Sequence, residues 1–413
     1  MELNNTKTTK SLFLTTLIMI VVSDDTLWFG TNGNSNFIII KYFVLLIILS
    51  FLFLISTKRI DLNRVQIPAL LCIVMCVLVL LTGILNSDLR NGYFYKCCIL
   101  MLSFLFVKNF SFEAFAETFE KVLFFFAATS AFCTTLATLN KALVSSFPVF
   151  YNSAGTEFYN LMVCMIAVPD VTIRNYGIFR EPGVFQMFLM LSLLFYTYYG
   201  GRIKIYRLVI YLIALGLTYS TTGYIAAGIF LILYLVKYSR KNSEKRTKQV
   251  MVVLIIAGLV FLSLTTNLLS RDGIIFNKFT NMRRHTTIAR FASVFTNIEM
   301  WFNSPILGNG LTYVNDYFPR LCLVRYGYAS PDNTNTLLCE LSTFGLLYTT
   351  IFVIGYSCLL KRFSKRKIEQ ALIGTILLVL MFGEKLTFSP IIYILMFYGF
   401  SSGNNNREMQ TRV

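Results

Sequence analysis

The chain carries a series of long apolar runs, several of which reach the roughly 20 residues that a helix needs to cross a bilayer. Of its 413 residues, 56% are hydrophobic and only 14% are charged, which gives a mean hydropathy of +0.64. A soluble core of this size does not require that balance. The sequence therefore predicts an all-α polytopic membrane protein, with residues 1–413 forming a single integral membrane domain.

The apolar runs indicate about twelve transmembrane helices, and the last two are so short that a broken hairpin is an alternative. No small-residue cleavage site follows the first run, so we expect an uncleaved span there. The predicted spans are residues 11–29, 36–56, 65–85, 92–108, 119–141, 183–200, 204–220, 222–238, 249–267, 335–360, 368–384 and 386–401.

Lysine and arginine residues in the short connections set the expected orientation, because they collect on the cytoplasmic side. Two basic clusters, at residues 237–248 and 361–367, are separated by two predicted spans and so lie on the same side. Counting back from them places both termini in the cytoplasm. Two long segments, about 142–182 and 268–334, then face outward. The net charge of +17 reflects these loops and does not indicate nucleic-acid binding.

The sequence gives no sign of a metal or nucleotide cofactor. Its nine cysteines have no metal-ligand spacing, and most fall within apolar runs, where cysteine acts as a small hydrophobic residue. No histidine–cysteine or carboxylate cluster has the spacing of a metal site, and no glycine-rich phosphate loop is present. We therefore expect no cofactor.

One polar stretch, Arg174–Gly183, stands at the entrance of the predicted span that begins near residue 183. Charge at a membrane entrance is costly unless it is paired, hydrated or used, so Arg174, Arg180 and Glu181 are candidate functional residues. The alternative is an ordinary helix start, since proline suits the first helical position and an acidic residue suits the positive end of the helix dipole. A helix start explains Glu181 and Pro182 but not two arginines six positions apart.

The second outward segment contains a predicted interfacial helix between residues 287 and 302. Its apolar residues recur at helical spacing and indicate a helix lying on the outer leaflet, with Trp301 at headgroup depth and Arg290 and Asn297 on the polar side. The recurring apolar residues are Ile288, Phe291, Phe295, Ile298 and Phe302. The residues expected to turn the chain after this helix are Pro305, Gly308 and Gly310.

Three further polar groups lie on the same predicted side. Ser220–Gly223 forms a turn between spans, Arg283–His285 lies in the second outward segment, and Asp332–Asn335 leads into a span that carries Glu340. Each has an ordinary alternative: a hydroxyl-lined helix hairpin, a solvated loop, and a hydrogen bond from Glu340 to a neighbouring helix. Several arginines from two loops suit a pyrophosphate, because planar guanidinium groups bind phosphate oxygens bidentately.

These residues resemble motifs of the bacterial O-antigen polymerase/ligase superfamily, whose members act on undecaprenyl-pyrophosphate-linked glycans at the outer face of the cytoplasmic (inner) membrane. Arg174–Gly183 is similar to the family's first outer-loop motif, and Ser220–Gly223 to the small-hydroxyl segment after it. Arg290, with the Trp301–Gly310 run, is similar to the second arginine motif. The similarity covers roughly residues 170–350 and implies a C-type membrane glycosyltransferase helical bundle.

A fourth motif separates the two branches of the family. Thr334 and Asn335, with Leu338 and Gly345 after them, resemble the histidine–asparagine motif of the ligase branch, but threonine stands at the histidine position. This departure favours a Wzy-type polysaccharide polymerase over a ligase. A flippase for lipid-linked sugar is a further alternative, although such a transporter more typically shows repeated halves and charges at the bilayer midplane.

The resemblance implies a metal-independent transfer in which an acceptor sugar hydroxyl attacks C1 of the donor glycan and undecaprenyl pyrophosphate leaves. The product would be O-antigen, capsule or exopolysaccharide. The expected catalytic residues are Arg174 and Arg290, on the pyrophosphate, and Glu181, as base or acceptor-orienting group. The expected substrate-binding residues are Arg180, Arg284, Asn335 and Glu340, of which Glu340 is the second choice for the base. The expected partners are lipid-linked donor and acceptor glycans, membrane lipid, a chain-length regulator and a flippase.

Overall fold

A computed structural model describes most of the chain, and within the described residues the fold is mostly helical. These residues are 2–24, 26–28, 44–53, 62–88, 90–151, 157–167, 173–201, 204–238, 285–327 and 333–401. Four of the helices within them are long and apolar enough to cross a membrane, which indicates a membrane protein.

The helix bounds follow the apolar runs of the sequence. From residue 62 onward, each predicted span within the described residues coincides with a helix, although the ends differ by several residues. The predicted span at 249–267 lies outside the described residues, and the total of twelve stays a prediction. The helices are α1 (Glu2–Val22), α3 (Leu62–Leu85), α4 (Asn91–Asn109), α5 (Phe112–Leu139), α6 (Lys141–Val144), α7 (Pro182–Tyr199), α8 (Ile205–Gly216), α9 (Thr221–Tyr238), α12 (His285–Asn303), α13 (Gly310–Tyr326), α14 (Thr336–Phe363), α15 (Lys367–Gly383) and α16 (Pro390–Phe400). A further helical stretch is Val44–Phe53.

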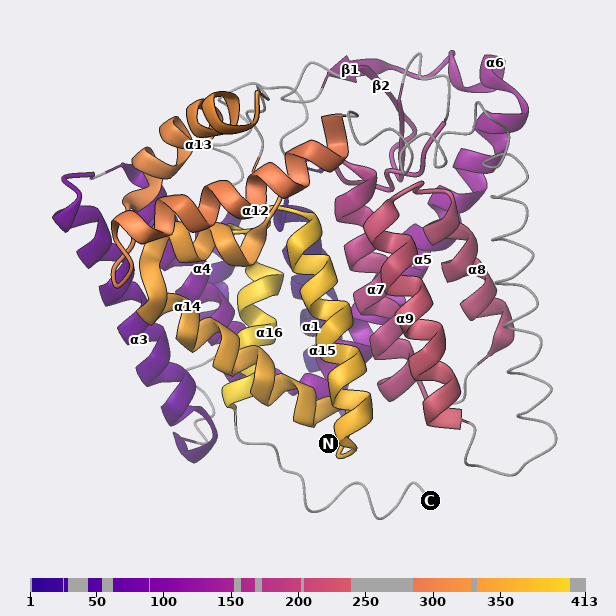
Figure 1. Ribbon diagram of the computed structural model, residues 1–413. Coiled ribbons are helices and arrows are strands. Elements are labelled where there is room, and N and C mark those ends of the chain that lie inside the picture. Colours follow the sequence, from indigo (N-terminus) through magenta and orange to yellow (C-terminus); the bar gives the residue numbers. More distant parts are fainter. Residues whose placement is uncertain are drawn as a thin grey trace.

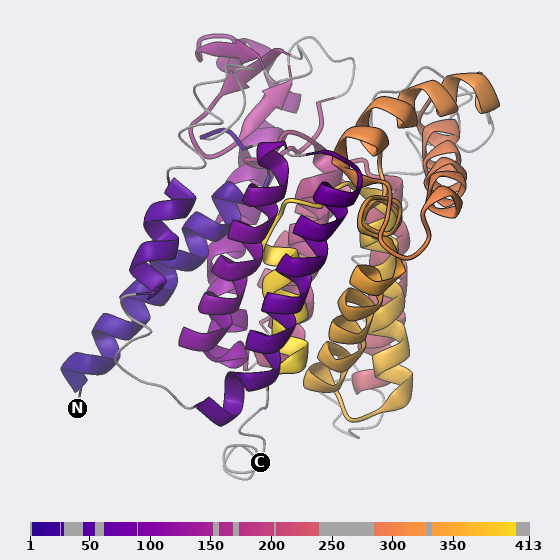
Figure 2. The same cartoon turned by 90° about the vertical axis from the view of Figure 1, so that its left-hand side faces the viewer.

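The long helices form a bundle with its extra structure gathered at one end, which we call the upper end (Figure 1). There α12 and α13 occupy one flank and the strands the other, a division that Figure 2 shows from the side. The start of α1, the end of α9 and the start of α15 lie at the lower end (Figure 1). The upper end thus carries the described parts of both segments that the sequence assigns to the outside. The lower end carries basic residues such as Lys237 and Arg362, in the last turns of α9 and α14.

A small antiparallel sheet, which the all-α prediction did not include, lies in the first long segment. Its strands are β1 (Val149–Tyr151), β2 (Glu157–Asn160) and β3 (Met165–Ala167), in the order β1-β2-β3. Aromatic residues favour strands, and Phe158 packs edge-on against Tyr176 with ring centroids 5.0 Å apart. The sheet therefore packs against the polar stretch that begins at Arg174.

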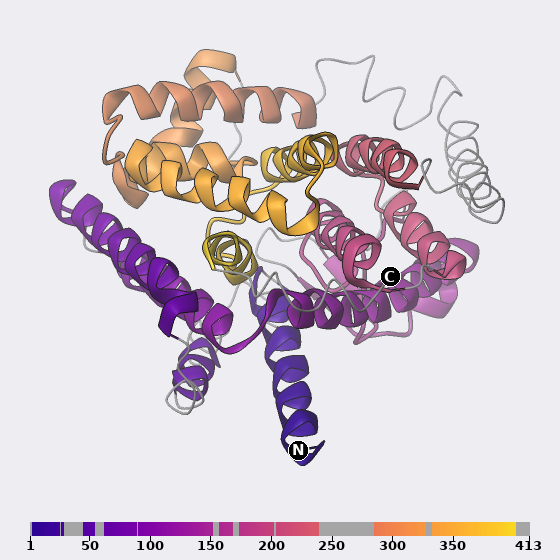
Figure 3. The ribbon, with the colours of Figure 1, turned by 90° about the horizontal axis from the view of Figure 1, so that it is seen from below.

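Helix α16 lies at the centre of the bundle and begins later than the predicted span. Seen from below, it lies among α14, α4 and α1, and Pro390 to Tyr398 are all buried (Figure 3). Pro390, the first residue of α16, has no backbone N–H and therefore cannot continue a helix from the residues before it. Residues 384–389 are consequently non-helical, and α15 and α16 form the broken hairpin that the sequence analysis held as an alternative.

Polar groups from other helices satisfy the backbone of this connection. Lys96 Nζ donates to the Thr387 carbonyl (2.5 Å), and Thr336 Oγ1 donates to the Glu384 carbonyl (2.5 Å) while accepting from Leu386 N (2.9 Å). Buried backbone N–H and C=O groups outside helices cost free energy unless a partner satisfies them. The connection is therefore held in place from α4 and α14.

Helix α12 crosses the upper part of the bundle (Figure 1). Its apolar stripe is turned outward. Phe291, Phe295 and Phe302 are 64%, 54% and 68% exposed, whereas the polar Ser293 and Asn297 are fully buried. This inversion of the pattern of a soluble protein suits a helix with lipid outside it. The prediction that Asn297 lies on the polar side is confirmed, but that side faces the protein and not water.

The buried polar face of α12 binds the start of α14. Asn297 exchanges hydrogen bonds with Asn333 (Nδ2 to Oδ1, 3.0 Å; Oδ1 from Nδ2, 2.9 Å) and also accepts from Ser342 Oγ (2.9 Å). Ser293 Oγ donates to Asn333 Oδ1 (2.8 Å). Hydrogen bonds between buried polar groups fix one relative position of two helices. Arg290 is thereby held above the start of α14.

Two glycines let the turn after α12 meet α14 backbone to backbone. Gly308 has φ +76° and Gly345, inside α14, has φ +76° and ψ −174°, a conformation open in practice only to glycine. A Cβ atom on Gly345 would lie 2.3 Å from the Ile306 carbonyl oxygen, and one on Gly308 would lie 2.2 Å from that of Thr343. The turn signals at Gly308 and Gly310 are confirmed, since Gly310 also has positive φ.

Gly345→Ala is expected to lower the thermal unfolding temperature by several degrees in detergent, because it adds backbone strain of about 1–3 kcal/mol and a clash with Ile306. Gly228→Ala is the matched control: its Cβ would meet nothing within 4 Å, and alanine is the better helix former. Fluorescence-detected size-exclusion chromatography after heating measures both variants. An unchanged unfolding temperature for Gly345→Ala would contradict the described backbone.

Candidate functional site

The stretch Arg174–Gly183 is a fixed loop, bounded on three sides by backbone hydrogen bonds. Its Ile178 carbonyl accepts from Leu27 N (2.7 Å), its Gly177 carbonyl from Met165 N (2.8 Å), and Asn175 N donates to the Leu217 carbonyl (2.8 Å). Inside the loop Gly177 adopts φ +54° against the ring of Phe185. Phe179 stacks on Phe188, with ring centroids 4.5 Å apart. The loop therefore delivers its last residues to a defined place at the start of α7.

Glu181 is the N-cap residue of α7 by its backbone, but its side chain makes no capping hydrogen bond and is exposed. Pro182 occupies the first turn of the helix, as the sequence predicted. The ordinary reading of a helix start is therefore right for the proline and leaves the Glu181 carboxylate unexplained. That carboxylate stands beside a second one from the far end of the chain.

The second carboxyl belongs to Glu384, just beyond the end of α15 and outside the helices. It is only 6% exposed, and a Cβ atom on Gly183 would lie 1.7 Å from its Oε1. Burial and the neighbouring Glu181 carboxylate raise the pKa of Glu384 to about 8, while the charges of Arg180 and Arg290 oppose that shift. A carboxyl with this pKa changes its protonation state close to neutral pH.

Two arginines from distant segments complete the group. Arg180 Nε donates to Asp24 Oδ2 (3.1 Å), which lies just after α1. Arg290 comes from α12, is half-buried, and lies close enough to influence the Glu384 carboxyl. We call Asp24, Arg180, Glu181, Arg290 and Glu384 the carboxyl–arginine cluster. Three of its members, Arg180, Glu181 and Arg290, were predicted as site residues from the sequence.

Three helices begin around this cluster. The starts of α7 and α9 touch, since Gln186 Nε2 donates to Thr222 Oγ1 (3.4 Å), and Thr222 also packs on Gly383. The start of α14 joins them through the bond from Thr336 to Glu384. Helix N-termini carry partial positive charge and unpaired N–H groups, so their convergence with arginines favours an anionic ligand.

Several buried polar atoms near these helix starts have no hydrogen-bond partner within the described part of the chain. Asn335 caps α14 by accepting from Leu338 N (2.9 Å), but its Nδ2 is unpartnered. Gln186 Oε1 and Thr334 Oγ1 are unpartnered as well. Leaving such groups unbonded costs about 1–3 kcal/mol each. Donors and acceptors left open at one place are what a polar ligand requires.

Arg174 lies with the Ser220 segment. Its Nε donates to the Thr218 carbonyl (3.1 Å) and its Nη2 to that of Tyr219 (3.4 Å), which ties the loop to the turn before α9. In that turn Ser220 Oγ and Thr222 Oγ1 lie 3.0 Å apart. The structure thus brings the two predicted polar groups together, and carbonyl contacts orient the Arg174 guanidinium.

Glu340 forms a contact between helices, the ordinary alternative considered for it. Its Oε1 accepts from Lys96 Nζ of α4 (2.6 Å) and from Tyr393 OH of α16 (2.7 Å), and Lys96 and Glu340 are both fully buried. Lys96 also contacts Tyr393 OH and four aromatic rings, those of Phe344, Tyr348, Phe388 and Tyr393. The pair holds α4, α14 and α16 together beneath the cluster.

Other predicted site residues lie outside the described residues, namely Arg283, Arg284 and Asp332, as does the side chain of His285. Conversely, Glu384, Asp24 and Lys96 were not among the residues predicted from the sequence. The rule that marks a charge within or beside an apolar run as a candidate applies to all three and could have found them. What the sequence does not reveal is that residues 24, 181 and 384 meet.

Within the described residues, no three histidine, cysteine, aspartate or glutamate side chains gather as metal ligands. The sequence comparisons with known proteins do not help to identify the site, so its function is argued from its geometry. No protein-family model matches the chain, and no curated protein matches it in sequence.

Proposed function

We propose that this chain is a membrane glycosyltransferase that joins lipid-pyrophosphate-linked oligosaccharide repeat units into a surface polysaccharide. The observation that carries the proposal is the carboxyl–arginine cluster. Arg180 and Arg290 come from separate segments of the upper end, and their charges act on a buried carboxyl, Glu384, that lies against the start of α7. That combination of two fixed cations and a base suits transfer from an anionic leaving group.

In the proposed reaction, a hydroxyl of the acceptor sugar attacks C1 of the donor glycan. The bond between C1 and the pyrophosphate oxygen breaks, and the pyrophosphate leaves with the electron pair. Its growing negative charge is stabilised by the guanidinium groups of Arg180 and Arg290, with Arg174 as a further candidate. The start of α7 adds backbone N–H groups at the same place.

The hydroxyl proton passes to Glu384 in this scheme. Glu384 is preferred to Glu340 because Lys96 and Tyr393 already occupy the Glu340 oxygen Oε1, in a fully buried place. Glu181, exposed beside Glu384, orients the acceptor hydroxyl and raises the pKa of the base. Asn335 and Gln186 offer unbonded polar atoms for sugar hydroxyls.

A ligase shares this chemistry and differs only in its acceptor. The polymerase is preferred because Thr334 stands where the ligase branch resembled in the sequence has histidine, and Thr334 Oγ1 has no partner within the described residues. A threonine hydroxyl binds a sugar but does not accept a proton near neutral pH as imidazole does. On this proposal the chain works in the bacterial inner membrane, with the cluster facing outward.

A deletion strain distinguishes the candidate functions through its envelope glycans. Loss of a polymerase is expected to leave single repeat units attached at the surface, which migrate as one short band on a glycan gel. Loss of a ligase would strand long glycan on the lipid carrier, and loss of a flippase would keep single lipid-linked units on the cytoplasmic side. Long attached glycan in the deletion strain would refute all three.

A further inference from the structure

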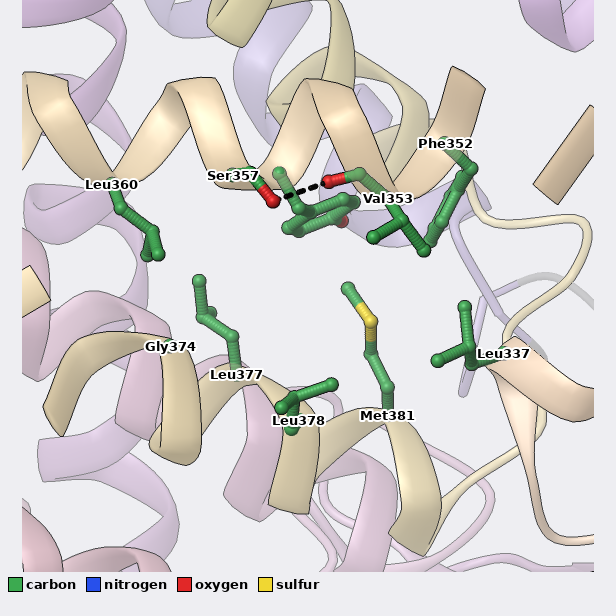
Figure 4. Close-up of a pocket in the computed structure, with 10 residues that line it drawn as sticks. Leu337, Phe352, Val353, Ser357, Leu360, Gly374, Leu377, Leu378 and Met381 are labelled. Atoms are coloured by element: carbon green, nitrogen blue, oxygen red, sulfur yellow. Dashed lines mark hydrogen bonds between the residues drawn. The ribbon is translucent and has the colours of Figure 1, made fainter. Parts of the chain in front are cut away.

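An apolar cavity of about 140 Å³ lies between α14 and α15, below the carboxyl–arginine cluster. Figure 4 shows side chains of the two helices facing each other across it. The lining runs from Leu360 and Gly374 at one end to Leu337 and Met381 at the other (Figure 4). The cavity thus lies along residues 352–360 of α14 and 374–381 of α15, with Leu337 at one end.

The upper end of the cavity adjoins the cluster. Leu337 directly follows Thr336, whose hydroxyl binds the Glu384 carbonyl, and Met381 lies one helical turn before Glu384. The end of the cavity between Leu337 and Met381 is therefore the end nearest to Glu384. The apolar cavity and the charged cluster lie next to each other along α14 and α15.

The lining selects for hydrocarbon. Its two hydroxyl groups are already bonded inside the protein: Tyr356 OH donates to the Ile392 carbonyl (2.9 Å) and Ser357 Oγ to that of Val353 (2.9 Å). Burying a polar ligand group without a partner is costly, so an apolar chain is the fitting occupant. An engineered cavity of about 150 Å³ binds benzene, so this one has room for one narrow hydrocarbon chain but not for two side by side.

We propose that this cavity holds the pyrophosphate-proximal isoprene unit of a polyprenyl pyrophosphate, the carrier of the donor glycan. The inference rests on the proposed function and assigns a binding site to the lipid part of the donor. A single chain fits the narrow space, whereas an ordinary phospholipid brings two acyl chains. The double charge of a pyrophosphate matches two arginines and the start of α7. The remainder of the chain extends into the bilayer.

Photolabelling of the purified full chain tests this directly. The probe is geranylgeranyl pyrophosphate with a diazirine on its first isoprene unit. We expect mass spectrometry to find the label on α14 and α15, near Leu337 and Met381. An unlabelled long-chain polyprenyl pyrophosphate should compete, and phosphatidylglycerol at the same concentration should not. Labels on other helices, or equal competition by phosphatidylglycerol, would overturn the proposal.

Two neighbouring residues of α14 provide a matched pair of variants. Val353 lines the cavity and is 43% exposed, whereas Ile354 does not line it and is 47% exposed. Val353→Trp fills the space and is expected to reduce labelling at least about tenfold, since a tenfold change needs only 1.4 kcal/mol of lost binding. Ile354→Trp, of equal size, should label like the wild type. Equal labelling of the two variants would contradict the cavity as the lipid seat.

Labelling needs no turnover, so this test separates the inference from the proposed function. A chain that labels between α14 and α15 but makes no polymer would keep the lipid site and refute the polymerase. A chain that polymerises but labels elsewhere would keep the polymerase and refute this seat for the lipid.

Discussion

Replacing Arg290 with alanine is expected to lower the rate of polymerisation by about 10²–10³-fold, the usual effect of removing one donor to transition-state charge. Arg290 lies on α12, whose hold on the bundle comes from Ser293 and Asn297, so the protein should still insert. Arg290→Lys should restore little, because an ammonium group does not form the two parallel bonds of a guanidinium. The measurement is a glycan ladder made from purified lipid-linked repeat units at equal enzyme concentration.

Arg325→Ala is the control for this experiment. Arg325 belongs to the same long segment but is 61% exposed and pairs with Glu299 on the surface (2.8 Å). Exposed pairs contribute little, so its loss should leave the ladder unchanged. A normal ladder from Arg290→Ala at normal protein level would remove Arg290 from the proposed mechanism. An equal loss in both arginine variants would show a general effect of charge.

Glu384→Gln is expected to slow transfer by roughly 10²–10⁴-fold, the range for loss of a general base. Glutamine keeps the size of the side chain beside Gly183, so insertion and thermal stability should change little. Lipid-linked single repeats should accumulate. Glu299→Gln, a carboxyl change on the exposed part of α12, is the control and should behave as wild type. A normal rate for Glu384→Gln would mean that substrate positioning by the arginines supplies the catalysis.

The same carboxyl predicts how the rate depends on pH. With the pKa of Glu384 at about 8, the active carboxylate is a minority at pH 7, and kcat/KM should rise about fivefold between pH 7 and pH 8. Glu181→Gln removes the carboxylate that helps to raise this pKa, so the rise should move to lower pH. Glu384→Gln should abolish the rise. If Glu181→Gln abolished it instead, Glu181 would be the base.

The helices were predictable from local signals. These signals are the length of an apolar run, Pro182 at a helix start and the glycines after α12. The structure confirms the helices and the turn that they predicted. The strands of the first long segment were not predicted, because short strands among aromatic residues lack a clear period. The direction in which the apolar face of α12 points was ambiguous as well. An amphipathic pattern shows two faces but not which of them meets the protein.

The site was predictable in part. Arg180 and Glu181 were identified because charge beside an apolar run is costly. Arg290 was identified on the polar side of the predicted interfacial helix and by its resemblance to a family motif. The same rule could have marked Glu384, but nothing near it in the chain shows that residue 181 will lie against it. Glu340, in contrast, was identified from the sequence but forms a contact between helices. An intramembrane carboxylate signals either function or a helix contact, and only its position beside Lys96 decides between them.

On the proposed function, the broken hairpin of α15 and α16 also sets when the protein becomes active during its synthesis. Ribosomes deliver a chain from its N-terminus, so Asp24, Arg180 and Arg290 are in the membrane before Glu384 has been translated. Until the hairpin docks against Lys96 and Thr336, the arginines have no buried carboxyl to work with. If the cluster works as proposed, a partly synthesised chain has the arginines but lacks both the base and the α15 wall of the cavity, and catalysis begins only with the final step of membrane assembly.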